Sequence, residues 1–278
     1  MNDTIYISIG SYIQTFVDWL NVNYSLPFEL LSALMEKSVK VFESILLFPH
    51  AFVVMAIFSL VAWRLAGRKV GCITFGGLFY CYLMNLWKAT MLTTALVGVS
   101  TVAALLVAIP LGIWSATNPT VDRITRPVMD LMQTMPPWVY LIPAVILFSL
   151  GRAPAVIATA VFAIPPALRL TNLGIKEVPR DQLEVGKAFG ATPMQIVWKI
   201  QIPTAMPSIM AGVNQCIMMS LSMVVLAGLI GAGGLGGEVV RGLTRMMVGV
   251  GVRSGLAIVV LAIIFDRVTQ GMVALSKH

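Results

Sequence analysis

Residues 171–203 read TNLGIKEVPRDQLEVGKAFGATPMQIVWKIQIP, and they form one long polar stretch in a chain that is otherwise very apolar. The stretch carries charged side chains of both signs, namely Lys176, Glu177, Arg180, Asp181, Glu184, Lys187 and Lys199. Apolar runs flank it on both sides. The contrast indicates a membrane protein whose most prominent polar segment stands outside the bilayer.

The same stretch carries the signals of two short helices. Pro179 suits the first turn of a helix, and Gly190 suits its C-terminal cap. Thr192 is a suitable N-cap for a second helix with Pro193 at its first position, and Pro203 is expected to stop that helix. The stretch therefore predicts two short helices at an angle, which serve either to dock another protein or as an ordinary cytoplasmic loop.

The composition excludes a water-soluble domain. Of 278 residues, 58% are hydrophobic and 11% are charged, whereas soluble domains carry about 25% charged residues. Apolar runs long enough to cross about 30 Å of hydrocarbon recur along the chain. We predict an all-α, polytopic helical membrane protein with about seven spans, at residues 50–66, 70–87, 90–116, 136–150, 153–170, 205–229 and 254–275.

The first 48 residues differ from the rest of the chain. Between residues 27 and 48, apolar and polar side chains recur at helical spacing, which indicates an amphipathic helix. That helix either lies on the membrane surface or packs on the spans, and a weaker pattern covers residues 5–20. The chain is thus divided into an interfacial N-terminal region at 1–48, two accessory spans at 49–88 and a main body at 89–278.

The distribution of basic side chains orients the spans. If residues 171–203 are cytoplasmic, twelve of the 19 lysines and arginines lie on the cytoplasmic side. The opposite orientation places fewer of them there, so we expect the N-terminus outside and the C-terminus in the cytoplasm. The net charge of +7 follows from this bias. Since no basic stripe is interleaved with aromatic side chains, nucleic acid is not an expected partner.

No residue pattern points to a metal site or a resident cofactor. Cys72, Cys81 and Cys216 lie in apolar stretches without metal-binding spacing. The sequence has no G-x-x-x-x-G-K-[ST] loop, so we expect ATP and Mg²⁺ to be bound by another chain. A run that satisfies G-x-G-x-x-G follows a span instead of a strand, which argues against a dinucleotide site. We interpret it as a flexible or closely packed segment near an outer gate, formed by Gly231, Gly233, Gly234 and Gly236.

The spacing within residues 184–203 is more specific. Glu184 is followed by small residues, by Gly190 and, after nine residues, by the sequence Ile-Gln-Ile-Pro that ends at Pro203. This pattern resembles the EAA motif, E-A-A-x3-G-x9-I-x-L-P, of the permease subunits of bacterial ABC importers. In that family the segment is the coupling helix that sits in a groove of the ATPase subunit. The resemblance implies this role for Glu184, Val185, Gly186, Gly190, Ile200, Ile202 and Pro203, where Val185, Gly186 and Ile202 depart from the motif.

Other stretches are similar, in the same order, to the glycine betaine/proline betaine (ProW/OpuAB-type) branch of this inner-membrane family. They are residues 130–137, 140–143, 169–174, 211–215 and 230–236. The resemblance implies a MetI-like transmembrane domain at 89–278 with coupling helices at 175–203, in the bacterial cytoplasmic (inner) membrane. It also implies a homodimeric pore, two copies of an ATPase subunit, an external solute-binding protein and a quaternary-amine osmoprotectant as cargo. The chain itself is then not an enzyme.

Polar residues inside spans and aromatic faces are the candidates for a translocation path. The candidates are Asn214, Gln215, Ser220, Ser222, Trp138 and Tyr140. The alternative for Asn214 and Gln215 is hydrogen bonding between helices. Trp138, Tyr140 and Phe148 offer faces to a trimethylammonium group, with packing or an interfacial belt as the alternative. Asp266 is interpreted as a charge near the cytoplasmic end of the last span.

Two other functions stay open at this point. The first is a permease of the same fold for another small cargo, such as choline, carnitine, trimethylamine N-oxide, methionine or a phosphonate. The second is a secondary transporter or membrane enzyme that uses no ATPase. The second class needs a membrane-embedded cluster of acidic, basic or ion-coordinating residues, and the predicted spans offer only Asp266. The sequence therefore favours the ATP-driven alternatives.

Overall fold

The computed structural model describes residues 15, 17, 19, 20, 23 and 25–275. In this part of the chain all regular structure is helical, which confirms the all-α prediction. The helices are α2 Ser25–Leu47, α3 Ala51–Ala66, α4 Arg68–Leu83, α5 Trp87–Thr117, α6 Pro119–Thr134, α7 Pro137–Phe148, α8 Arg152–Lys176, α9 Arg180–Ala188, α10 Pro193–Ile196, η1 Val197–Gln201, α11 Ile202–Leu226, η2 Ala227–Ile230, α12 Gly234–Thr244 and α13 Val248–Leu275. Most of the weak amphipathic pattern at 5–20 and the end of the chain lie outside the described residues.

Four helical segments are long and apolar enough to cross a membrane, and they correspond to four of the predicted spans. They are Trp87–Thr117, Arg152–Lys176, Pro193–Ile230 and Val248–Met272. Two bent pairs, α2 with α3 and α6 with α7, raise the number to at most six if each pair is one span. By length and composition the described residues thus hold four to six candidate spans, where the sequence predicts about seven.

The prediction of a separate span at 136–150 is wrong, because α7 has only 12 residues. At 1.5 Å per residue it covers about 18 Å, too little for a bilayer. α7 bends away from α6 by 99° at the Pro136-Pro137 pair. Met135 precedes these prolines and is extended, as the residue before a proline usually is. α6 and α7 together take the place of one predicted span.

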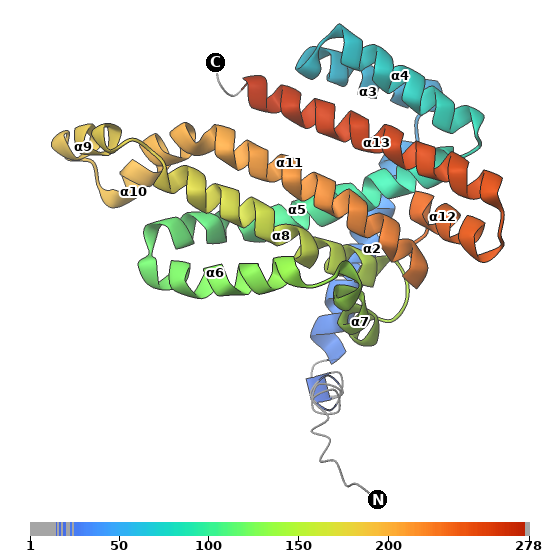
Figure 1. The fold of residues 1–278 in the computed structure, drawn as a ribbon, viewed down its shortest axis with the longest axis horizontal. Coiled ribbons are helices and arrows are strands. Elements are labelled where there is room, and N and C mark those ends of the chain that lie inside the picture. Colours follow the sequence, from blue (N-terminus) through green and yellow to red (C-terminus); the bar gives the residue numbers. More distant parts are fainter. Residues whose placement is uncertain (1–14, 16, 18, 21–22, 24, 276–278) are drawn as a thin grey trace, which may run out of the picture.

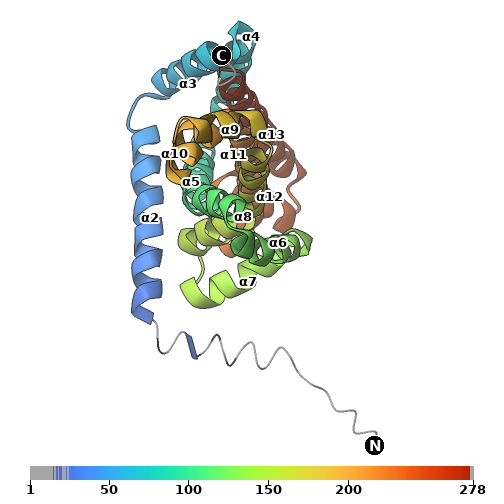
Figure 2. The ribbon, with the colours of Figure 1, turned by 90° about the vertical axis from the view of Figure 1, so that its left-hand side faces the viewer.

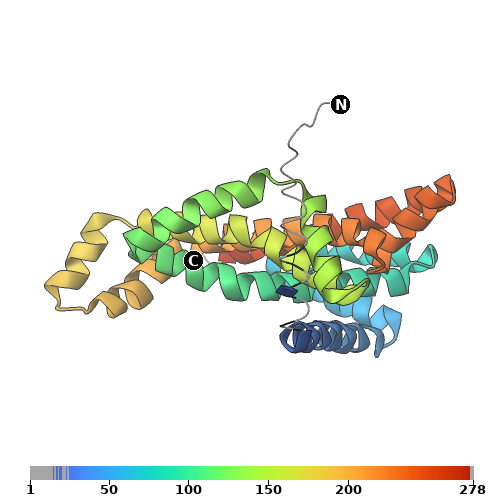
Figure 3. The same ribbon diagram turned by 90° about the horizontal axis from the view of Figure 1, so that it is seen from below.

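The long helices α5, α8, α11 and α13 run side by side along the bundle (Figure 1). α9 and α10 project beyond one end of it, and α12 with the turn into α13 lies at the other (Figures 1 and 3). Small residues let α8 approach both neighbours closely. A Cβ on Gly112 of α5 would lie 2.7 Å from Cβ of Thr171, and a Cβ on Gly174 of α8 would lie 2.6 Å from Cβ of Ser208 on α11. Close packing of this kind joins α5, α8 and α11 into one closely packed group.

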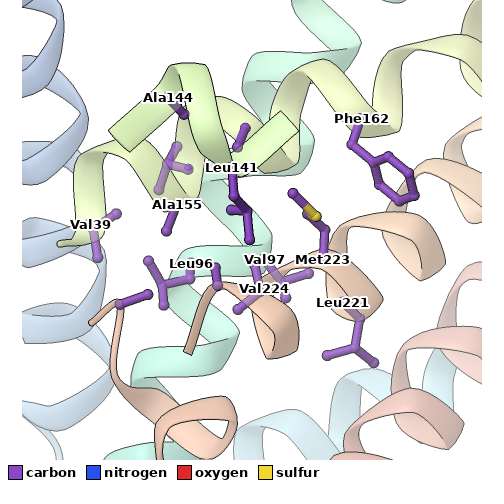
Figure 4. Close-up of a cluster of buried hydrophobic side chains, with 14 of the residues drawn as sticks. Val39, Leu96, Val97, Leu141, Ala144, Ala155, Phe162, Leu221, Met223 and Val224 are labelled. Atoms are coloured by element: carbon purple, nitrogen blue, oxygen red, sulfur yellow. The ribbon is translucent and has the colours of Figure 1, made fainter. Parts of the chain in front are cut away.

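The largest buried cluster lies in the half of the bundle away from α9 and α10 (Figures 1 and 4). It joins side chains of α2, α5, α7, α8 and α11, including Val39, Leu96, Leu141, Val156 and Met223. Figure 4 shows side chains from these elements meeting in one place. The short helix α7 is therefore anchored in the core, although it is too short to cross the membrane alone.

The predicted amphipathic helix is present as α2, and it packs on the bundle. Figure 2, which looks along the bundle, shows α2 upright against one side of it. Val39 is fully buried in the main cluster. Arg152 of α8 donates to Glu43 at 2.7 Å, and the rings of Phe28 and Phe148 meet edge to face at 5.5 Å. Packing on the spans is thus observed, while the location of this helix at a membrane surface stays a prediction.

Candidate coupling segment and membrane path

The turn between α9 and α10 forms as the sequence predicts. Pro179 is the N-cap of α9, and Gly190 follows its C-terminal end with φ +74°. Backbone N–H groups of Gly190 and Ala191 donate to the carbonyls of Lys187 and Gly186 at 2.9 and 3.0 Å. These bonds satisfy carbonyls that a helix end leaves free, and glycine reaches the left-handed conformation without a steric penalty.

The N-terminus of α10 is capped by a reciprocal pair of hydrogen bonds. The backbone N–H of Gln195 donates to Oγ1 of Thr192 at 3.4 Å, and the backbone N–H of Thr192 donates to Oε1 of Gln195 at 2.8 Å. Pro193 stands at the first helical position, where its missing N–H is not needed. This capping box gives a four-residue helix a defined direction.

Two positions of the EAA-like pattern, Gly186 and Ile200, contact each other. Gly186 is buried in α9, and a Cβ placed on it would lie 2.5 Å from Cδ1 of Ile200. Cδ1 is the end of a flexible side chain, so an alanine methyl group is accommodated by a rotation of Ile200. The small residue at 186 and the isoleucine at 200 therefore pack α9 against the segment that leads into α11.

Replacing Gly186 tests this contact. Gly186→Ala is expected to retain transport within about twofold, whereas Gly186→Leu should reduce it roughly tenfold or more, because overpacking costs about 1–3 kcal/mol. Cargo uptake at matched membrane content is the measurement. Ile200→Ala in the Gly186→Leu background should restore part of the activity, and full activity of Gly186→Leu alone would contradict the contact.

The prediction that Pro203 ends the second helix is wrong. α10 leads through one π-helical turn, Val197–Gln201, directly into α11, and Pro203 lies in the first turn of that long helix. In the π turn the N–H of Ile202 donates to the carbonyl of Val197. The wider turn lets the chain pass a proline, which lacks a donor and would crowd the carbonyl four residues earlier. The helical connection joins the candidate coupling segment, α9 and α10, to the long helix α11 without a loop.

Large apolar side chains are exposed on the projecting tip. They are Val185, Phe189, Met194 and Trp198, with Phe189 88% exposed. Glu184 and Lys187 are exposed beside them on α9. A patch of aromatic and aliphatic groups within mixed charge is typical of a protein-binding surface. Ile202 instead packs at the base of the segment, against a buried cluster that includes Ile175 and Ala205.

The path candidates on α11 do not form one lining. Asn214 donates to Asp266 Oδ1 of α13 at 3.3 Å and accepts from Thr269, so it connects two helices. Gln215 and Ser222 are exposed, and the hydroxyl of Ser222 donates to the carbonyl of Met218. Ser220 is fully buried.

Asp266 lies within α13, well before its last turn, and also accepts a hydrogen bond from Gln270. Asp266 therefore does not stand at the end of α13 but takes part in a polar contact between α11 and α13, while its distance from the cytoplasmic face stays a prediction.

The aromatic candidates on α7 also do not form one lining. Tyr140 is buried, donates its hydroxyl to the carbonyl of Met132 and meets Phe162 edge to face at 5.5 Å. Trp138 is half exposed. Phe148 contacts Phe28 of α2. The packing alternative thus describes Tyr140 and Phe148, and Trp138 alone of these presents a large free face.

The glycine-rich segment at the opposite end is closely packed. Gly231, Gly233 and Gly234 have φ angles of +85°, +80° and +66°. A Cβ on Gly236 would lie 2.4 Å from the carbonyl oxygen of Val225, and one on Gly228 would lie 2.4 Å from the carbonyl carbon of Gly236. The sequence left open whether this segment is flexible or closely packed. The structure favours close packing, with backbone against backbone.

Thr93 of α5 holds this segment through one buried hydrogen bond. The backbone N–H of Leu235 donates to its Oγ1 at 2.8 Å, and both residues are fully buried. Thr93→Val keeps the shape and removes the acceptor, so it should destabilise the protein by about 1–3 kcal/mol. A lower melting temperature in detergent, with Thr94→Val as the neighbouring control, is the measurement. An unchanged melting temperature would contradict a structural role for the bond.

A polar network between α6 and α8 is the feature that sequence reasoning missed. Arg169 pairs with Asp130 and donates to Gln133 at 2.9 Å, while Lys176 pairs with Asp122 at 2.7 Å. A cavity of about 430 Å³ lies between the helices at this network. Arg169 and Asp130 lie 39 residues apart in the sequence, so only the fold brings them together. Within the described residues no group of three or more His, Cys, Asp or Glu side chains is arranged to hold a metal ion.

Comparison with known proteins identifies similar sequences and folds. The family model described as "binding-protein-dependent transport system inner membrane component" matches residues 108–276. The glycine betaine/proline betaine permease ProW of Escherichia coli is 41% identical over 96% of this chain and 75% of its own length. The glycine betaine permease OpuAB of Bacillus subtilis is 40% identical over 98% and 96%. A solved structure of the MetNI methionine ABC transporter, inward facing, has a TM-score of 0.63 at 21% identity, over 71% of this chain and 98% of that one.

Proposed function

Because the chain belongs to the family of binding-protein-dependent transport system inner membrane components, we propose that it is the membrane-spanning subunit of an ATP-driven importer. The observation that carries the proposal is the projecting segment α9–α10. It is capped at each turn, exposes apolar side chains at its tip and continues without a loop into α11. Such a segment passes a displacement at its tip to a membrane span.

The partners follow from the family. An ATPase subunit and a solute-binding protein work with permeases of this kind. We propose that two copies of this chain form the pore and that two ATPase subunits bind their α9–α10 segments. ATP and Mg²⁺ belong to those subunits, and this chain binds no cofactor and hydrolyses no ATP. The residues proposed to form or support the docking surface are Glu184, Val185, Gly186, Gly190, Ile200, Ile202 and Pro203.

The proposed orientation places α9–α10 in the cytoplasm and the α12–α13 turn on the outer side. The basic residues support this choice, because more lysines and arginines then lie inside. The two ends of the bundle are opposite each other, so a solute-binding protein on the outer end and an ATPase on the inner end do not compete for space (Figure 1). The N-terminus is outside and the C-terminus inside in this arrangement, within the bacterial inner membrane.

The proposed cargo is a quaternary amine of the glycine betaine/proline betaine class. Two relatives that are 40–41% identical over nearly the whole chain are named as permeases for glycine betaine or for glycine betaine and proline betaine. A glycine betaine/carnitine permease of Listeria monocytogenes is 41% identical over 95% of the chain. Trimethylamine N-oxide, choline or another small solute is the second candidate, because a permease for trimethylamine N-oxide is 34% identical over 81% of the chain.

The proposed mechanism is alternating access. ATP binding closes the ATPase dimer and brings the two α9–α10 segments together. Since α8 and α11 continue from this segment and pack closely through Gly174 and Gly212, they tilt as one group and open the outer side. ATP hydrolysis resets the state. The exposed residues Gln215, Ser222 and Trp138 remain the proposed contacts for a weakly bound cargo. Asn214, Ser220 and Tyr140, which are bonded or buried between helices, are proposed to support them from the packed interior.

Uptake in a reconstituted system tests the function. The chain, its ATPase subunit and its solute-binding protein are placed in liposomes, and labelled glycine betaine, choline and trimethylamine N-oxide are offered in turn. ATP-dependent uptake of glycine betaine is the expected result. If only choline or trimethylamine N-oxide is taken up, the proposed cargo is wrong. If uptake does not need the ATPase subunit, the proposal of an ATP-driven importer is wrong. Glu184→Lys or Gly190→Asp should abolish uptake while the chain still inserts into the membrane.

A further inference from the structure

Three side chains converge on the carboxylate of Asp122 in the first turn of α6. Lys176 of α8 pairs with Oδ1 at 2.7 Å, Arg126 pairs with Oδ2 at 2.8 Å, and Asn172 of α8 donates to Oδ1 at 3.1 Å. Asn172 also donates to Oγ of Ser115 in the last turns of α5 at 2.6 Å. The network therefore joins α5, α6 and α8 where all three approach the same end of the bundle.

The position of Lys176 makes this network relevant to the coupling segment. Lys176 is the last residue of α8, and α9 begins four residues later at Arg180. Val178, which lies between the two helices, is buried. The short connection is thus held at Lys176 and at Val178, so α9 leaves the bundle in a fixed direction relative to Asp122 and α6.

We propose that Asp122 is a positioning residue that makes α6 move together with the coupling segment. This inference rests on the proposed function. The carboxylate joins the end of α8 to the start of α6, so a displacement of α9 is passed to α6 as well as along α8 and α11. α6 continues through its bend into α7, whose Leu141 and Ala144 lie in the main buried cluster. The movement of the tip thereby reaches the opposite half of the bundle by a second route.

Burial and the number of partners distinguish this network from the other ion pair between the same helices. The side chain of Asp122 is 14% exposed and has three partners. Asp130 and Arg169 also pair across α6 and α8, but their side chains are 58% and 54% exposed. Exposed pairs contribute about 0–1 kcal/mol, whereas removal of one partner from a shielded network leaves the others unsatisfied. Asp130 is therefore the matched control for Asp122.

The inference is tested by neutralising each carboxylate in the complete importer. Asp122→Asn is isosteric and removes the charge, and it should lower the amount of cargo moved per ATP hydrolysed by about 2- to 30-fold. Asp130→Asn should leave this ratio unchanged, and Asp122→Glu should restore most of it. Lys176→Gln should reproduce the loss, and the double variant Asp122→Asn/Lys176→Gln should be no worse than either single variant, because both remove one interaction.

A distance measurement tests the same inference without any cargo. Spin labels at Ile124 on α6 and Arg180 on α9, both exposed, are introduced after the exposed Cys72 is replaced by serine. In the wild-type complex the distance distribution should stay narrow, and its centre should be the same with and without ATP. In Asp122→Asn it should broaden or shift when ATP binds.

The outcomes separate the inference from the function on which it rests. An Asp122→Asn variant with the wild-type ratio of cargo to ATP and a narrow distance distribution would overturn the positioning role. Equal losses in Asp122→Asn and Asp130→Asn would do the same, because they would show a general effect of surface charge. Failure of the wild-type complex to transport glycine betaine would instead overturn the proposed cargo, and the distance measurement would still test Asp122.

Discussion

Replacing Gly236 with valine should prevent the accumulation of folded protein in the membrane. A Cβ at this position would lie 2.4 Å from the carbonyl oxygen of Val225 and 2.8 Å from its Cα. Both are backbone atoms at the end of α11, so no side-chain rotation relieves the clash. The cost should exceed the roughly 1–3 kcal/mol typical of overpacking by side chains, and total stabilities are only about 5–15 kcal/mol. Fluorescence size-exclusion chromatography of the extracted protein is the measurement.

The neighbouring glycine provides the control for this prediction. A Cβ on Gly237 has open space around it, and Gly237 also lies in α12. Gly237→Val should therefore give a monodisperse peak close to the wild-type height. A normal peak for Gly236→Val would show that α12 is able to move away from α11, in which case the glycine-rich segment is a flexible gate instead of a packed joint.

Replacing Phe189 with aspartate should weaken the association with the ATPase subunit strongly and reduce transport by roughly 30-fold or more. Phe189 lies at the tip of the coupling segment and is 88% exposed, so the folded chain does not depend on it. A buried aromatic anchor at the centre of an interface contributes about 2–4 kcal/mol, and a charge placed there is left without a partner. Co-purification with the ATPase subunit and ATP-dependent uptake are the measurements.

Met246 offers a matched control at the opposite end of the bundle. Its side chain is 90% exposed in the turn between α12 and α13, far from α9 (Figure 1). Met246→Asp should leave co-purification with the ATPase subunit unchanged, whatever its effect on the solute-binding protein. If Phe189→Asp retains the ATPase subunit as well as Met246→Asp does, the tip of α9–α10 is not the docking surface.

The sequence alone determined the class of the protein and the local structure of the turn between α9 and α10. Helix starts and ends depend on neighbouring residues, so Gly190, Thr192 and Pro193 were sufficient to predict a capped turn between two short helices. Four of the seven predicted spans correspond to helices that are long and apolar enough to cross a membrane. The spacing from Glu184 to Pro203 pointed to the family, which the comparisons confirm over residues 108–276.

The path of the chain at its prolines was decided by tertiary structure. Pro203 and the Pro136-Pro137 pair look alike as helix breakers, yet only the second produces a bend, of 99°. At Pro203 a π turn absorbs the proline and keeps the helix continuous. Sequence patterns report only the local preference of a residue, and a proline permits either a bend or a continuous helix with a π turn. At Pro203 the continuous helix is found, where α9 packs against Val197–Gln201 through Gly186 and Ile200.

Contacts between distant segments were also decided only by the fold. Gly186 with Ile200, Thr93 with Leu235 and Asp122 with Lys176 each join separate helices. The same holds for Asn214, whose partner Asp266 lies 52 residues away. A polar residue in an apolar run signals that it needs a partner, because an unpaired polar group in hydrocarbon is costly. Which helix supplies that partner is set by helix packing, and the contacts of Asp122 on which the proposed route from α9 to α6 rests are of this kind.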